Sequence, residues 1–110
     1  MDIKKTDAYT LIKSTEDSVK EFVDCFKQNY LQLSEKHIII DFSEKINTEI
    51  KDLLLFLKIS SKHRTNGYSF VIICNGIEID DIPDEINVVP TFTEALDILE
   101  MDAIERDLGF

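Results

Sequence analysis

Few residues of this 110-residue chain have the types and spacing that metal or redox chemistry requires. The two histidines, His37 and His63, have no second histidine or cysteine at the spacing of metal ligands. His63 is predicted near a helix C-terminus, where partial positive charge is favoured. Cys25 and Cys74 are far apart and match no metal or redox motif, which indicates free, part-buried thiols. We therefore expect no metal and no cofactor.

A catalytic triad can be assembled only formally, from Ser43, His63 and Asp41. The glycines that place such a serine on a sharp strand-to-helix turn are missing from this stretch. The three glycines of the chain lie in no glycine-rich run, which argues against a phosphate-binding loop. An enzyme is therefore the least favoured class of function.

An acidic segment contains Asp80, Asp81, Asp84 and Glu85, whose carboxylates are the kind of ligand that divalent cations prefer. These residues lack the spacing of a calcium loop. A solvated acidic loop is the favoured interpretation, with a cation site as the weaker alternative.

The net charge of −10 is distributed unevenly along the chain. Residues 1–64 carry 11 acidic and 11 basic residues, whereas residues 65–110 carry 11 acidic residues and one basic residue, Arg106. An acidic body repels phosphate backbones and anionic membranes, so we expect no nucleic-acid partner. The acidity favours solubility over an acidic docking surface, which stays the second interpretation.

No apolar run approaches the roughly 20 residues that a membrane-spanning helix needs. The first seven residues lack the apolar core of a signal peptide. We expect a soluble, cytoplasmic protein without membrane insertion.

Hydrophobic periodicity, capping residues and turn signals divide the chain into alternating strands and helices. The expected elements are a hairpin over 3–13, a helix capped by Ser18, a strand over 37–43, a helix over about 48–61, a strand over 68–74, an edge strand over 87–90 and a helix capped by Thr91. This order predicts a single α/β domain over residues 1–110. An N-terminal hairpin is followed by alternating helices and strands, giving a mixed, centrally parallel sheet of about five strands with helices packed on it.

The helix expected over 48–61 is apolar on nearly all sides. Its predicted core face consists of Ile46, Ile50, Leu53, Leu54 and Leu57. Three further apolar residues fall outside that stripe, namely Leu55, Phe56 and Ile59. They require either a second layer of the same chain or a partner molecule, and the sequence leaves both open.

Three strings of sequence, combined with the order of elements, resemble a STAS domain, the fold of anti-sigma factor antagonists. The strings are Ile38–Ser43, Tyr68–Ile72 and Asn87–Leu96. The resemblance spans essentially the whole chain. It implies a bacterial, cytoplasmic regulator that binds a protein partner, an anti-sigma factor or kinase-like regulator, and is switched by phosphorylation of a serine at the start of the second helix.

The chain departs from that family at the phosphorylation motif. Asp41-Phe42-Ser43 matches the strand end, but Asn47-Thr48-Glu49-Ile50 takes the place of Asp-Ser-Ser-Gly. Glu49 then occupies the phosphoacceptor position, either imitating a phosphate or serving as an ordinary first-turn carboxylate. The turn before this helix is about two residues shorter than in the family, so the alignment needs a gap. If that gap is placed elsewhere, Thr48 is the candidate phosphoacceptor. The segment 76–87 is also shorter than the family's third helix.

We therefore predict a non-catalytic interaction and regulatory domain that binds a protein partner through the start of its second helix. The predicted contact residues are Ser43, Asn47, Thr48, Glu49, Asp52, Phe56 and Ile59. A second copy of the chain is an alternative partner. The alternative function is binding of a small molecule, lipid-like or a nucleotide, without partner switching.

Overall fold

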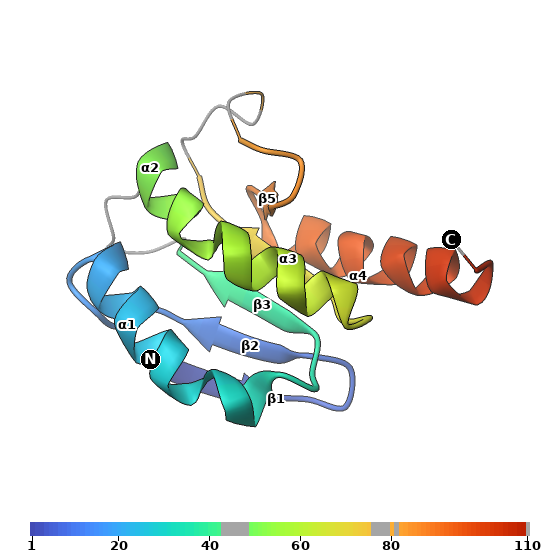
Figure 1. Ribbon diagram of the computed structural model, residues 1–110, viewed down its shortest axis with the longest axis horizontal. Coiled ribbons are helices and arrows are strands. Elements are labelled where there is room, and N and C mark those ends of the chain that lie inside the picture. Colours follow the sequence, from blue (N-terminus) through green and yellow to red (C-terminus); the bar gives the residue numbers. More distant parts are fainter. Residues whose placement is uncertain (43–48, 76–79, 81, 110) are drawn as a thin grey trace.

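The computed structural model describes residues 1–42, 49–75, 80 and 82–109. Strands and helices alternate after an initial hairpin (Figure 1). The elements are β1 (Asp2–Lys5), β2 (Thr10–Lys13), α1 (Val19–Leu33), β3 (Ile38–Asp41), α2 (Ile50–Leu53), the 3₁₀ turn η1 (Leu54–Phe56), α3 (Leu57–Thr65), β4 (Phe70–Ile73), β5 (Asn87–Val89) and α4 (Phe92–Asp107).

The strands form one five-stranded sheet in the order β1-β2-β3-β4-β5. β1 and β2 pair antiparallel, with Ile3 opposite Ile12, and every later pair is parallel. The predicted α/β class with a mixed, centrally parallel sheet is confirmed. β5 lies at the edge of the sheet, as predicted, and it ends at Val89, directly before Pro90, which has no N–H to donate to a ladder hydrogen bond.

Successive residues of β3 point to opposite faces of the sheet and enter two separate cores. Ile38 and Ile40 pack in the larger core, which α1, η1 and α3 cover, and Ile39 packs in the smaller core under α4. Figure 1 shows α1 and α3 in front of the sheet. The two helical layers therefore lie on opposite faces.

Both long helices begin at the caps that the sequence predicts. The Ser18 hydroxyl accepts a hydrogen bond from the Glu21 N–H at 3.2 Å, and Thr91 does the same for Glu94 at 3.2 Å. Each cap satisfies an otherwise unpartnered backbone donor, so α1 and α4 start at fixed points relative to the sheet.

The second helix differs from the sequence prediction in its start, its continuity and its buried face. α2 begins at Ile50 and passes through η1 into α3. The buried positions follow helical spacing, at Leu53, Phe56, Ser60 and His63. Two of these four residues are polar, so the hydrophobic pattern favoured a different face that contains Leu54 and Leu57. Leu54 is in fact exposed.

Within the described ranges, no helix combines the length and apolar character that crossing a membrane requires.

Candidate functional site

The predicted contact residues at the start of the second helix divide into two groups. Ser43, Asn47 and Thr48 lie outside the described residues. Glu49 is the N-cap of α2, and its N–H donates to the Asp52 carboxylate at 3.0 Å. The Glu49 carboxylate lies 3.3 Å from the Lys51 ammonium, with both side chains mostly exposed. These are the contacts of a capped helix start, which favours the interpretation of Glu49 as a capping residue.

The prediction that Phe56 contacts a partner is wrong. Its side chain is 0% exposed and lies inside the larger core. Four aromatic rings surround it at centroid distances of 5.9 to 6.2 Å, those of Phe22, Phe26, Phe42 and Phe70. Ile59 is half-buried and packs against the same core. The outward-facing leucines of this helix are Leu54 and Leu55, each 42% exposed.

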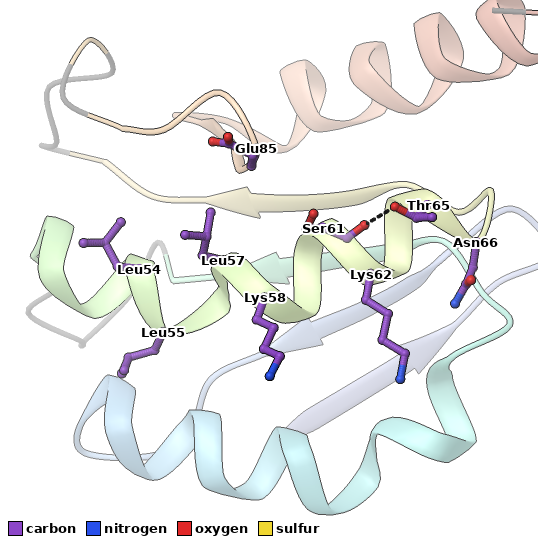
Figure 2. Close-up of a pocket in the computed structure, with 9 residues that line it drawn as sticks. All are labelled: Leu54, Leu55, Leu57, Lys58, Ser61, Lys62, Thr65, Asn66 and Glu85. Carbon is purple, nitrogen blue, oxygen red and sulfur yellow. Dashed lines mark hydrogen bonds between the residues drawn. The ribbon is translucent and has the colours of Figure 1, made fainter.

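A hollow of about 690 Å³ runs along the outer side of η1 and α3 (Figure 2). We call it the α3 groove. Leu54 and Leu57 point toward the segment that carries Glu85, and Leu55, Lys58 and Lys62 point toward the opposite side (Figure 2). Its lining residues are Leu54, Leu55, Leu57, Lys58, Ser61, Lys62, Thr65, Asn66 and Glu85. The α3 groove therefore combines an apolar end with a basic side.

One wall of the α3 groove is held in place by hydrogen bonds to α3. The Ser60 hydroxyl donates to the Glu85 carbonyl at 3.1 Å, and the Arg64 guanidinium donates to the same carbonyl at 2.9 Å. The Thr65 hydroxyl donates to the Ser61 carbonyl at 2.9 Å, drawn as a dashed line in Figure 2. Because Ser60 is fully buried, these bonds anchor the Glu85 wall to the core.

A buried polar cluster surrounds His63, near the C-terminal end of α3. His63 Nε2 lies 2.6 Å from the Lys36 carbonyl, which can only accept, so Nε2 carries the proton. Nδ1 is then the acceptor for the Tyr30 hydroxyl at 2.7 Å. Burial lowers the pKa of His63 and raises the pKa of Tyr30. The expectation of positive charge on His63 at the helix C-terminus is therefore wrong, because desolvation favours the neutral ring.

A second polar contact joins α4 to the start of β4. The buried Ser69 hydroxyl donates to the Asp102 carboxylate at 2.7 Å and accepts from the Arg106 guanidinium at 3.2 Å. His37 Nδ1 accepts from the Ser69 backbone N–H at 2.9 Å, not from its hydroxyl. Because the histidine does not face the hydroxyl proton, the arrangement does not activate Ser69 as a nucleophile. It fixes α4 against the sheet.

These polar contacts could not be predicted from sequence patterns. Their residues lie 27 to 37 positions apart and belong to no motif. Among the residues that the structure describes, no group of three His, Cys, Asp or Glu side chains could hold a metal ion.

Comparison with protein-family models found no family that matches this chain, and comparison with curated proteins found no match. The structure shows an α/β domain with an apolar and basic groove along η1 and α3.

Proposed function

We propose that this chain is a non-catalytic protein-interaction and regulatory domain that receives its partner in the α3 groove. The observation that carries the proposal is the position of Leu54 and Leu55, two neighbouring leucines held 42% exposed beside a hollow of about 690 Å³. Exposed apolar side chains that line a depression are typical of docking surfaces.

The shape of the α3 groove favours a macromolecule over a small ligand. Small-molecule sites bury about 70–90% of their ligand between several walls. Here η1 and α3 supply seven of the nine lining residues, Asn66 directly follows α3, and Glu85 is the one residue from another segment. A lipid-like molecule would stay largely in water. The volume nonetheless exceeds the roughly 300 Å³ of small-molecule sites, so ligand binding is the second candidate.

The side chains of the α3 groove specify the chemistry of the partner. Leu54, Leu55 and Leu57 require apolar side chains, and Lys58 and Lys62 favour carboxylates beside them. Apolar residues on one face with acidic neighbours describe an amphipathic acidic helix, which is a common occupant of helix-lined grooves. The regulatory part of the proposal rests on the resemblance to STAS domains. By that resemblance, the partner is an anti-sigma factor or kinase-like regulator, and Thr48 or Glu49 modulates binding.

The test is capture of partners by the tagged full-length chain from its native source, followed by mass spectrometry. Leu55→Asp places a charge in the α3 groove without entering the core. Leu31→Asp is the matched control, because Leu31 is 90% exposed on α1 and does not line the α3 groove. Circular dichroism must show that both variants are folded.

We expect the same captured protein with the wild type and with Leu31→Asp, and its loss with Leu55→Asp. Retention of that protein by Leu55→Asp would contradict the proposal. A small molecule found by native mass spectrometry in the wild type, and lost in Leu55→Asp, would favour the second candidate.

A further inference from the structure

The C-terminal half of α4 carries an exposed apolar stripe. Met101 is 56% exposed, Ile104 is 55% exposed and Leu108 is 66% exposed. Their spacing of three and four residues puts them on one face of the helix. Figure 1 shows that this half of α4 extends past the strands of the sheet. Its inward side contacts Ser69 through Arg106 and lines a hollow with Arg64 and Thr65 at the end of α3. The stripe is therefore exposed to solvent in the single chain.

Acidic residues flank this stripe. Asp97, Glu100, Glu105 and Asp107 lie on the same helix. Its one basic residue, Arg106, points inward to donate to the Ser69 hydroxyl. The projecting half of α4 thus has the chemistry of an acidic amphipathic helix. This is the kind of helix proposed above as the occupant of the α3 groove.

The α4 helix of one molecule cannot fill the α3 groove of that same molecule. Ala95, Ile98 and Leu99 pack α4 onto one face of the sheet, together with Ile39 and Val71. η1 and α3 pack onto the opposite face, through Leu53 and Phe56. At its far end the α3 groove does come near α4, because Thr65 also lines a hollow with Asp102, Glu105 and Arg106 of the same chain. The leucines of the groove lie at its other end, on η1 and the start of α3, so a contact between them and the stripe would join two molecules.

We propose that the α3 groove receives the projecting half of α4 from a second copy of this chain. Met101, Ile104 and Leu108 pack against the leucines of the groove, and the flanking carboxylates face Lys58 and Lys62. This inference rests on the docking surface proposed above, and it names as occupant a second copy of the chain in place of the anti-sigma factor or kinase-like regulator that the resemblance implies.

The size of the contact indicates how the copies assemble. A stable interface buries about 1,200 Å² or more of total surface, and three side chains in one shallow groove bury less than that. A two-fold pair forms the contact twice, whereas a head-to-tail arrangement builds chains. We expect reversible, concentration-dependent association that weakens as salt screens the carboxylate–lysine contacts.

The test is complementation between two variants of the full-length chain. Leu55→Asp blocks the α3 groove and leaves α4 intact, whereas Ile104→Asp blocks the stripe and leaves the α3 groove intact. Sedimentation velocity over about a hundredfold range of concentration measures association of each variant alone and of a 1:1 mixture, with one variant fluorescently labelled. Leu31→Asp is the control for an added surface charge. A second pair, Lys58→Glu and Glu105→Lys, tests the charged contacts.

We expect the wild type and Leu31→Asp to associate, and each blocking variant alone to lose at least about tenfold in apparent affinity. The mixture should recover association, because it restores one intact groove and one intact stripe. A wild type that stays monomeric, or a mixture that associates no better than its components, would overturn the inference. If the wild type is monomeric but Leu55→Asp still loses a captured protein, the inference fails and the proposed function stands.

Discussion

Replacing Phe56 by alanine should remove a large part of the stability of the domain, whereas the same change at the neighbouring Leu55 should remove little. Phe56 is 0% exposed, and a buried Phe→Ala change costs about 3–5 kcal/mol through lost transfer energy and the cavity left behind. The four surrounding rings add aromatic contacts to that loss, so we expect at least about 4 kcal/mol, in the upper half of the range. Domains unfold with about 5–15 kcal/mol, so this one change would remove between roughly a quarter and four fifths of the free energy of unfolding.

The corresponding magnitude for Leu55→Ala follows from its exposure. Its side chain is 42% exposed, so truncation recovers only part of the transfer energy of a leucine and opens no closed cavity. We expect a loss of about 1 kcal/mol or less. The comparison thus separates two residues that the hydrophobic pattern alone treats as equivalent.

Urea unfolding followed by far-ultraviolet circular dichroism measures both variants at neutral pH. Linear extrapolation gives the free energy of unfolding, and an unchanged slope shows that the same surface is exposed in each case. Equal losses for the two variants, or a loss below about 1 kcal/mol for Phe56→Ala, would refute the assignment of Phe56 to the core and reopen its role as a contact residue.

Three further predictions concern polar groups and one turn. The lowered pKa of His63 means that the unfolded chain binds the proton more readily, so stability should fall as pH drops below about 6.5; a histidine NMR titration giving a pKa at or above 6.5 would contradict this. Ser69→Ala should cost about 1–2 kcal/mol in urea unfolding, because Asp102 loses its buried donor, and no measurable loss would show that the contact is unimportant. Gly67→Ala should cost about 1 kcal/mol, because φ is +93° although no atom lies within 4 Å of the added Cβ; an unchanged midpoint would contradict that reasoning.

The sheet and the two long helices were predictable from local patterns. The β-branched run at Ile38–Ile40 is buried on both faces, which is the signature of a central parallel strand. Ser18 and Thr91 cap helices because their hydroxyls satisfy the first backbone donors, and that chemistry needs no tertiary context. The α/β class and the strand pairing follow from this alternation.

The buried face of the second helix was not predictable in the same way. Ser60 and His63 occupy core positions because Glu85, Tyr30 and Lys36 satisfy their polar atoms. Those partners are distant in sequence, so hydrophobic periodicity could not place the two polar residues inside. Because the buried face was predicted wrongly, Phe56 was assigned to the surface. The α3 groove could not be predicted either, because its position depends on which leucines point outward.

The measurement that tests the account most directly is site-specific photo-crosslinking of the full-length chain in its native source. A photoreactive phenylalanine analogue replaces Leu55 in the α3 groove or, as control, Leu31 on α1, and mass spectrometry identifies whatever is attached. We predict a specific protein adduct at position 55 and none at position 31. If the occupant is a second copy of the chain, the adduct should have twice the chain mass, with the crosslink joining position 55 to α4. No adduct at position 55, or the same adducts at both positions, would contradict the α3 groove as a docking surface.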